Sequence, residues 1–389
     1  MDSELFNSLI DISESKAAQA SKADLVLEKA RWAATAFNDY DLSLTMKIVD
    51  SVAQCAYDNA ENFAQKAVSE TGFGVVKHKK IKNELTSKPL VNYYRNSDFV
   101  NSRVIDQLKM IEIPRPAGVI FALTPSTNPI ATLNYKIILS LMTRNAIVVS
   151  PHPAARETSI EATISLYEAA LNAGAPKGAI QILDNPTIPL VEAFMKSPKT
   201  NVILATGGSP MVRAAYSSSN PAIGVGPGNV PVFVDSSANV SEAAKQIVTS
   251  KSFDNSVLCT NESVLITLDD IANKLLISLK SEGAYVCNDQ QTSAIRNYLF
   301  YGKSFNIAAI GRDAVWIANQ CGIKVPSNTK ILITPINQIG VEEKLSSEKL
   351  CPVLAFHVSK NRKSAISQSR AVLRLAGSGH SAAIHAKDE

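Results

Sequence analysis

Short runs of uninterrupted apolar residues alternate with longer helical patterns through most of this chain, and this alternation restricts its fold more than any other feature. Such runs are typical of strands that are buried on both faces. Strands are predicted at residues 118–123, 146–149, 179–183, 202–205, 231–235, 263–268, 330–334 and 353–358. Helices are predicted between them at residues 129–142, 158–173, 190–196, 241–250, 271–279 and 293–301. The pattern predicts an α/β fold with parallel sheets covered by helices.

The length of 389 residues suits two domains. The first, residues 1–230, opens with Ala-rich helical stretches at 17–37 and 42–68 and contains the first four predicted strands. Within it, apolar residues flank a polar turn at about residues 99–114, which predicts a hairpin arm. The second domain, residues 231–389, contains the remaining strands.

Charge and cysteine usage exclude several classes of protein. The net charge of +4 is small, and no basic cluster interleaved with aromatic residues indicates a nucleic-acid partner. The basic run at residues 77–82 is interpreted as a solvated helix face. The five cysteines are odd in number, far apart and without a C-x-x-C pair, which argues against a disulfide framework and for a reducing compartment.

Targeting, membrane and metal signals are also missing from the sequence. The first four residues are acidic and do not open a signal peptide, and no apolar run has the length of a membrane span. We therefore expect a cytoplasmic protein with no membrane partner. The five histidines lack metal-ligand spacing, since even His380 and His385 are five residues apart, so we expect no metal site.

Cys259 is the candidate nucleophile. A polar, turn-like segment precedes it and the apolar run 263–268 follows it, so its thiol is predicted at the mouth of a strand. Enzymes of this class place nucleophiles at strand ends, and a thiolate attacks carbonyl carbon readily. The alternative is that Cys259 only fills space, because cysteine is among the most buried residue types.

Three loops follow predicted strands at the edge where parallel sheets bind ligands: residues 124–128, 150–153 and 206–209. Asn128 is interpreted either as the cap of the next helix or as an amide N–H donor to an oxyanion. The pair Gly207 and Gly208 suits close approach of an anionic ligand to a helix start, although a tight turn explains it equally. No G-x-G-x-x-G fingerprint is present.

Several segments in a fixed order carry a family resemblance. They are residues 70–74, 124–129, 144–147 with 150–153, 205–212 with 214–216, 224–229, 253–259, 348–352 and 377–381. In this order they resemble the aldehyde dehydrogenase superfamily, in particular its coenzyme A-acylating branch. The resemblance implies a Rossmann-like cofactor domain, a catalytic domain, a hairpin arm used in oligomerisation, and assembly as a homodimer or homotetramer.

The resemblance also implies roles for particular residues. Cys259 falls on the catalytic thiol, and Asn128 falls on the amide that stabilises the oxyanion together with the backbone N–H of Cys259. Glu348 falls on the carboxylate that binds the nicotinamide ribose. The cofactor is expected to be NAD, with NADP as the alternative. The other residues placed around the cofactor are Thr124, Pro125, Ser150, Pro151, His152, Thr206, Gly207, Gly208 and Gly226. His380 lies in a segment typical of the acylating branch, without a role that the sequence defines.

Relatives that hydrolyse their thioester carry a glutamate base where this chain has residues 222–229, and this segment contains no acid. Water attacks poorly without a base, whereas a thiol is more acidic and more nucleophilic. We therefore expect coenzyme A as the acyl acceptor and a short aldehyde as the substrate, of the acetaldehyde or sulfoacetaldehyde type. Glu262, close to Cys259 in sequence, is an alternative base.

The chain departs from the family pattern at its C-terminus, because the family continues beyond the segment at residues 380–385 and this chain ends at Glu389. The expectation is a truncated catalytic domain with an unpaired sheet edge. Two other interpretations stay open: a phosphate-dependent semialdehyde or glutamyl-phosphate reductase, and an inactive homologue that acts only by association.

Overall fold

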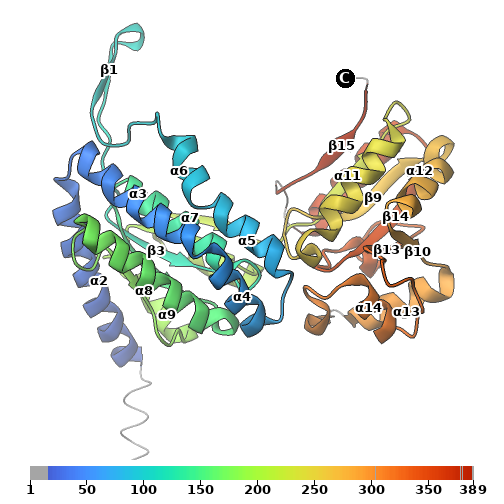
Figure 1. Cartoon of the computed structure of the whole chain (residues 1–389), viewed down its shortest axis with the longest axis horizontal. Coiled ribbons are helices and arrows are strands. Elements are labelled where there is room, and N and C mark those ends of the chain that lie inside the picture. Colours follow the sequence, from blue (N-terminus) through green and yellow to red (C-terminus); the bar gives the residue numbers. More distant parts are fainter. Residues whose placement is uncertain (1–15, 303, 377, 379, 388–389) are drawn as a thin grey trace, which may run out of the picture. The chain divides into compact units, whose positions relative to one another are not determined.

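The computed structural model describes residues 16–302, 304–376, 378 and 380–387 and divides the chain into two compact units. The first unit consists of Met1–Thr71 with Lys79–Gly226, and the second of Gly72–His78 with Pro227–Glu389. Each unit contains one parallel sheet (Figure 1), as the alternating pattern predicts. The acidic first four residues, and Gly377 and Gly379 of the last family-like segment, lie outside the described residues.

The sheet of the first unit has the strand order β5-β4-β3-β6-β7, and all neighbouring strands are parallel. Its strands are β3 (Val119–Leu123), β4 (Ala146–Ser150), β5 (Ile180–Ile182), β6 (Val202–Thr206) and β7 (Ala222–Val225). The order reverses at β3, so the ends of β3 and β6 are where such a sheet binds ligands. The short strand β7 was not predicted, because its four residues alternate between partly buried and exposed.

Helices form two packed layers around this sheet. Helices α3, α7 and α8 pack together, and α2 packs on α9. The reversal of strand order places α9 on the face opposite α7 and α8, because crossover connections are right-handed. The helices of the unit are α2 (Lys16–Asn38), α3 (Leu42–Asp58), α4 (Ala60–Thr71), α6 (Lys88–Tyr94), α7 (Pro129–Met142), α8 (Arg156–Ala173), α9 (Ile188–Lys196) and α10 (Ser209–Tyr216).

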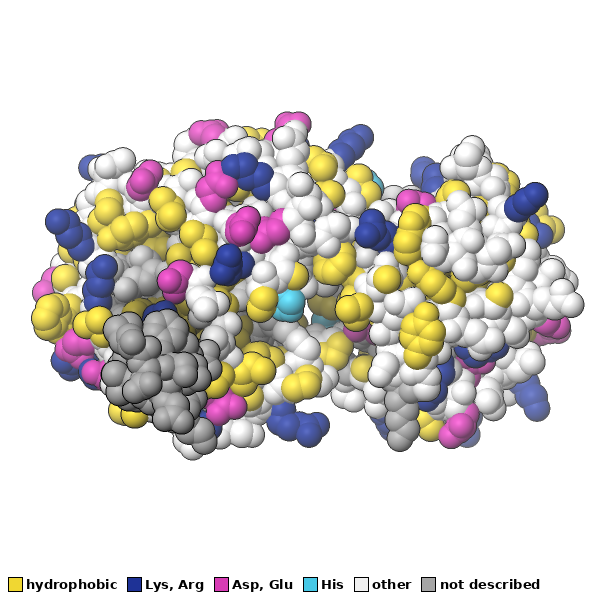
Figure 2. All heavy atoms as spheres, turned by 90° about the horizontal axis from the view of Figure 1, so that it is seen from below, with side chains coloured by type: hydrophobic (Ala, Val, Ile, Leu, Met, Phe, Trp, Pro, Cys, Tyr) yellow, Lys and Arg dark blue, Asp and Glu magenta, His cyan; other side chains and the backbone are white. Residues whose placement is uncertain are grey.

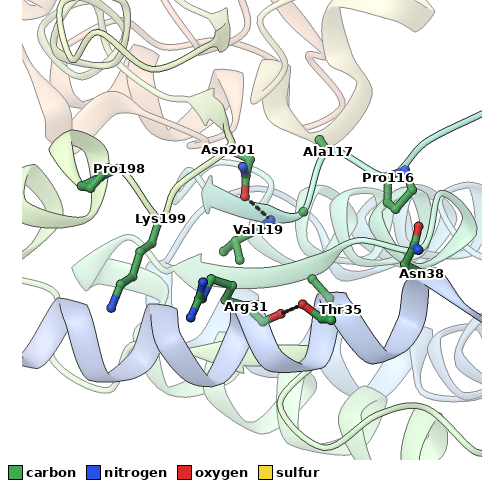
Figure 3. A pocket seen from close by; sticks show the side chains of 11 residues that line it. Arg31, Thr35, Asn38, Pro116, Ala117, Val119, Pro198, Lys199 and Asn201 are labelled. Atoms are coloured by element: carbon green, nitrogen blue, oxygen red, sulfur yellow. Dashed lines mark hydrogen bonds between the residues drawn. The ribbon is translucent and has the colours of Figure 1, made fainter.

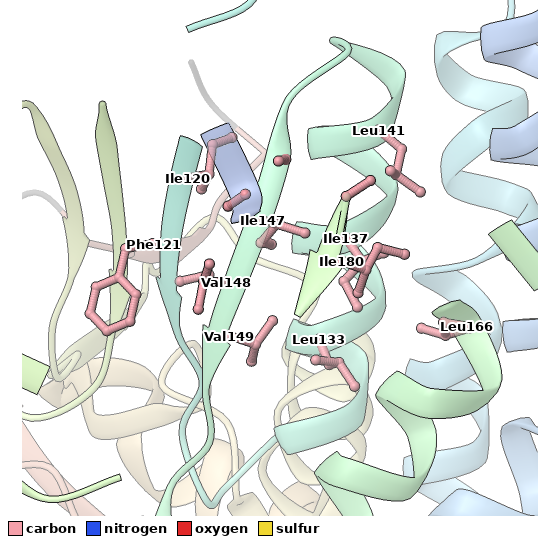
Figure 4. Packing of buried hydrophobic residues seen from close by; sticks show 14 of the residues in the cluster. Ile120, Phe121, Leu133, Ile137, Leu141, Ile147, Val148, Val149, Leu166 and Ile180 are labelled. Atoms are coloured by element: carbon pink, nitrogen blue, oxygen red, sulfur yellow. The ribbon is translucent and has the colours of Figure 1, made fainter. Parts of the chain in front are cut away.

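Part of the core of the first unit lies between strand β4 and helix α7 (Figure 4). Leu133, Ile137 and Leu141 recur every four residues along α7, so they share one helix face. All three are fully buried in the same cluster as Ile147 and Val149 of β4. Burial of side chains of this size contributes about 1.5–3 kcal/mol each, and it fixes the start of α7 relative to the ends of the strands.

The helix predicted at residues 42–68 is in fact two helices, α3 and α4, separated by Asn59. The N–H of Asn59 still donates to the carbonyl of Cys55 at 3.1 Å, and the Asn59 side chain donates to the same carbonyl at 2.9 Å. Apolar periodicity alone does not reveal this break, because buried residues recur at helical spacing on both sides of Asn59.

The predicted hairpin arm consists of strands β1 (Arg103–Ile105) and β2 (Met110–Glu112), with Val104 paired to Ile111. The arm exposes apolar side chains on both strands: Val104 is 66% and Ile111 67% exposed. An exposed apolar surface of this kind is typical of an interaction site.

The sheet of the second unit has the order β10-β13-β14-β9-β8-β15 and is also parallel. Its strands are β8 (Val230–Val234), β9 (Glu262–Leu268), β10 (Ala284–Val286), β13 (Ile331–Pro335), β14 (Val353–Ser359) and β15 (Ala383–His385). The helices are α11 (Val240–Ser252), α12 (Asp269–Ser281), α13 (Asp289–Leu299), α14 (Ala314–Gln320) and α15 (Arg362–Leu375). The helix predicted to reach residue 301 ends at Leu299, where the two-residue strand β11 (Phe300–Tyr301) pairs with β12 (Ser304–Phe305).

A tyrosine covers part of the edge of the first sheet. The hydroxyl of Tyr216, at the end of α10, accepts from the N–H of Gly224 at 2.9 Å and donates to its carbonyl at 3.3 Å. Gly224 lies in β7, which is an edge strand among the described residues. A Cβ at Gly224 would lie 2.8 Å from Tyr216 Cε2 and 2.6 Å from Val212 Cγ1, so a side chain at this position would obstruct the ring.

Surface charge is mixed on the face shown in Figure 2, where Lys and Arg side chains are interspersed with Asp and Glu. Within the described part of the chain, none of the helices has both the length and the apolar character that crossing a membrane requires.

Candidate active site

Cys259 lies between the 3-10 helix η3 (Phe253–Ser256) and strand β9, as the sequence predicts, and it is partly buried. The other cysteines are in environments that disfavour the reactive thiolate. Burial raises the pKa of Cys287 to about 12 and that of Cys321 and Cys351 to about 11, and it also raises the pKa of Cys55. Only the thiolate is a strong nucleophile, so these four are poor candidates.

The turn before Cys259 has an unusual backbone. Asp254, Asn255 and Ser256 have φ values of 52°, 51° and 63°, in a region that residues other than glycine rarely adopt. Each such residue costs of order 1 kcal/mol and persists only where surrounding contacts hold it. Here the carboxylate of Asp254 accepts from the N–H of Val75 at 2.7 Å, and the backbone N–H of Asp254 donates to His78 Nδ1 at 2.8 Å.

Two more contacts hold this turn, and one glycine is required by it. Phe253 stacks on the ring of His78 with centroids 4.4 Å apart, and the amide of Asn255 donates to the carbonyl of Gly311 at 2.9 Å. Gly74 has φ +79°, and a Cβ there would lie 2.2 Å from the Asp254 carboxylate. Gly74 therefore lets the backbone approach the turn that presents Cys259.

Gly228 belongs to the acid-free segment and lies directly against the nucleophile. A Cβ at Gly228 would lie 2.1 Å from the carbonyl oxygen of Cys259 and 3.2 Å from His380 Nδ1. Real Cβ atoms are not found at the first distance, so position 228 excludes every side chain and not only a glutamate. His380 is thereby placed near the nucleophile, and its Nδ1 also lies 3.0 Å from Ser381 Oγ.

Glu348 reaches the same segment. Its carboxylate accepts from the N–H of Gly228 at 3.3 Å, and burial raises its pKa to about 7. The buried Lys251 and Lys349 interact electrostatically with Glu348. Glu262, the alternative base, is buried at the start of β9, where its carboxylate accepts from Ser250 Oγ at 3.0 Å. Burial also raises the pKa of Glu262.

In the first unit, the predicted cofactor residues lie at the carboxyl ends of β3, β4 and β6. Thr124 and Ser150 are buried, and the backbone N–H of Thr124 donates a hydrogen bond to the Ser150 carbonyl at 3.1 Å. Pro125 follows Thr124, and Pro151 and His152 follow Ser150. The hydroxyl of Thr124 is buried without a hydrogen-bond partner among the described residues. A buried hydroxyl of this kind at a ligand-binding edge fits a polar group of a ligand.

The glycine turn lies at the end of β6. Thr206 ends the strand, the N–H of Gly207 donates to the Val225 carbonyl at 3.2 Å, and Gly208 precedes helix α10. A Cβ at Gly226 would meet no atom within 4 Å, so space is open there. A glycine turn at a helix start is a common place for a phosphate group to bind.

Asn128 precedes helix α7 but does not cap it with its side chain. Its side-chain oxygen instead accepts from Lys82 Nζ, and its amide nitrogen lies 3.4 Å from Thr127 Oγ1. Helix α5 (Val76–Leu85), which contains the basic run, was interpreted as a solvated face. That interpretation is wrong for Lys79, which is 3% exposed and donates to the Thr127 carbonyl at 2.8 Å.

Lys136 is a further buried residue near this edge, and the sequence does not predict it. It is buried in α7 and donates to the carbonyls of Leu123 at 2.6 Å and Leu204 at 2.8 Å, so it joins β3 and β6 near their carboxyl ends. Burial lowers its pKa to about 7. The available signal was that Lys136 is the one charged residue within helix α7.

A cavity of about 470 Å³ lies elsewhere in the first unit (Figure 3). It opens at the amino ends of β3 and β6, beside Val119 and Asn201, so it is at the edge opposite the loops discussed above. Its Lys199 is paired with Asp24 at 2.7 Å and with Glu28 at 2.9 Å. No predicted site residue lines it. Among the described residues, no cluster of His, Cys, Asp and Glu side chains could hold a metal ion.

Known proteins are similar to this chain along most of its length. Residues 10–290 match the model of the aldehyde dehydrogenase family. The aldehyde-alcohol dehydrogenase of Clostridium acetobutylicum is 37% identical over 96% of this chain, which spans 43% of that protein. An acetylating aldehyde dehydrogenase of Geobacillus thermoglucosidasius superposes with a TM-score of 0.93 at 37% identity, over 96% of this chain and 83% of that one. A propionaldehyde dehydrogenase of Rhodopseudomonas palustris, with bound coenzyme A and an acylated cysteine, gives 0.83 at 29% identity, over 94% and 83%.

Proposed function

The chain belongs to the aldehyde dehydrogenase family, and we propose that it converts a short aldehyde, NAD⁺ and coenzyme A to an acyl-CoA, NADH and a proton. The observation that carries the choice of coenzyme A is the contact between Gly228 and Cys259. It leaves no space for a base at position 228, and residues 222–229 contain no acid. The relatives whose names and structures mention acetylation or coenzyme A support the same choice.

In this proposal the Cys259 thiolate attacks the aldehyde carbon and forms a tetrahedral adduct. The amide N–H of Asn128 and the backbone N–H of Cys259 donate to its oxyanion, a large term in acyl chemistry. The chemistry that NAD⁺ supplies when bound is acceptance of a hydride from the adduct. Loss of that hydride leaves a thioester on Cys259, and the thiol of coenzyme A displaces the Cys259 sulfur to release acyl-CoA. The reverse reduction of an acyl-CoA uses the same groups.

The dinucleotide would be held by the residues that follow the strands of the first unit and by Glu348. The unpartnered hydroxyl of Thr124 and the open space at Gly226 support this assignment. The other residues of the proposed cofactor site are Pro125, Ser150, Pro151, His152, Thr206, Gly207 and Gly208. We propose NAD as the cofactor, with NADP as the alternative, since Ser150 carries no charge toward or against a 2′-phosphate.

The aldehyde itself is proposed only as a class: short, of the acetaldehyde or sulfoacetaldehyde type. Assembly as a homodimer or homotetramer is proposed through the exposed apolar arm, residues 103–112.

NADH formation tests the proposal. The purified chain is given acetaldehyde or sulfoacetaldehyde with NAD⁺ or NADP⁺, and with coenzyme A, phosphate or neither. We expect turnover that requires coenzyme A and acyl-CoA as the product, and no turnover by Cys259→Ala. Turnover with phosphate in place of coenzyme A would support the reductase alternative. Turnover with neither acceptor would contradict the argument from Gly228. A folded protein without any turnover would support the inactive alternative.

A further inference from the structure

Asn128 occupies a capping position without capping. Asparagine before a helix normally accepts from the N–H groups of the first turn. Here the side chain makes no such bond, and Pro129 at the first helical position removes one of the N–H groups. A side chain that departs from its local preference in this way is usually held by a contact from elsewhere in the fold. In this structure a lysine makes that contact.

Lys82 fixes the orientation of the Asn128 side-chain amide. An ammonium group can only donate, so the group that it contacts must be the amide oxygen. Lys82 Nζ donates to Asn128 Oδ1, which directs the NH₂ end away from the lysine. A cation on the oxygen also polarises the amide and makes its N–H groups stronger donors.

Lys79, one turn earlier on the same helix, holds the adjoining backbone. It donates to the Thr127 carbonyl at 2.8 Å and is nearly fully buried. Residues three apart on a helix lie on one face, so Lys79 and Lys82 contact consecutive residues of one loop. Lys80 lies on a different part of the helix surface and pairs with Glu61 at 2.7 Å.

We propose that Lys82 is a positioning residue that fixes and polarises the Asn128 amide as an oxyanion donor, while Lys79 holds the peptide before it. The proposal rests on the proposed function, in which Asn128 donates to the oxyanion. It assigns a role within the reaction to part of the basic run, whose charge pattern alone indicates only a solvated helix.

A double-mutant cycle in the aldehyde assay tests the proposal. We expect Lys82→Met to lower kcat by about 10- to 100-fold, somewhat less than loss of an oxyanion donor itself. KM for NAD⁺ should stay within about twofold, because the change affects the transition state. Lys82→Arg should restore part of kcat, and Lys80→Met is the matched control without effect. In an Asn128→Ala background, Lys82→Met should change kcat by less than about twofold. An equal loss in both backgrounds would overturn the proposal.

A second cycle separates this proposal from the proposed function. The shift in Tm is measured for Lys82→Met, Asn128→Ala and the double variant. If Lys82 acts through Asn128, the double variant loses no more than the more damaging single variant, whether or not the protein turns over aldehyde. Additive shifts would contradict the contact itself. If the shifts are coupled but wild-type protein is inactive, the contact stands and the catalytic role falls together with the proposed function.

Discussion

Gly228 shows how one missing side chain controls the surroundings of a reactive thiol. We predict that Gly228→Ala lowers the free energy of unfolding by about 1–3 kcal/mol, because the new methyl group must displace the Cys259 carbonyl. We also expect slower alkylation of Cys259 by iodoacetamide. Gly226→Ala is the matched control, since a Cβ there meets open space, and it should change stability by less than about 1 kcal/mol. Equal effects of the two changes in denaturant unfolding would argue against the close approach.

Glu348 provides a prediction with a definite pH dependence. Burial raises its pKa from 4.5 to about 7, so between these values the folded protein binds more protons than the unfolded protein. Its contribution to stability therefore falls as the pH rises through this window. Glu348→Gln should not show this loss. The free energy of unfolding of the variant minus that of wild type should therefore be larger above pH 7 than at pH 4.5, by about 2 kcal/mol after allowance for partial exposure of the side chain.

The same carboxyl should govern cofactor affinity if it binds the ribose. Only the carboxylate form accepts two hydroxyl hydrogen bonds, so NAD⁺ affinity should rise as the pH increases through about 7. Glu348→Gln should bind NAD⁺ more weakly, with a flat profile. Titration calorimetry between about pH 6 and pH 8 measures this, and a wild-type affinity that does not change with pH would exclude the role.

At the scale of elements, the turn at residues 253–256 combines backbone strain with a buried hydroxyl. Ser256 has φ 63°, and its hydroxyl has no partner among the described residues. We predict that Ser256→Gly stabilises the protein by up to about 1 kcal/mol, because glycine adopts this conformation without strain. Ser252→Gly, at the ordinary helical φ of −85°, should destabilise by about 0.5–1 kcal/mol. Thermal unfolding of the two variants should move Tm in opposite directions.

Most elements of both sheets could be predicted from the sequence, because their burial leaves uninterrupted apolar runs. Helix α7 was predicted with its observed bounds, since Pro129 marks its start. Helix α15 was not predicted, because only Ala365 and Val372 of its residues are buried, and they form no apolar stripe. Within the site, a position next to a strand suggested Cys259. No local pattern reveals that Lys82 or Lys136 finds an oxygen partner far away in sequence, because such contacts exist only after folding.

At the scale of the whole molecule, the apolar arm predicts self-association. Replacing the paired Val104 and Ile111 by glutamate should shift the mass measured by light scattering toward the monomer, because like charges would then face each other on an interaction surface. The matched control exchanges Arg103 and Glu112, which form an ion pair beside them, and should leave the mass unchanged. An unchanged mass in the glutamate variant would place any interface elsewhere.

The phenol of Tyr216 on Gly224 has a consequence for the protein at high concentration. An edge strand offers its outward N–H and carbonyl groups as a template on which strands of other molecules can align. Tyr216 occupies both groups of Gly224, so a foreign strand would have to displace the ring before it could extend the sheet. The hydroxyl thereby opposes fibril-like growth of the sheet at Gly224, because it occupies backbone groups that would otherwise be open to pairing.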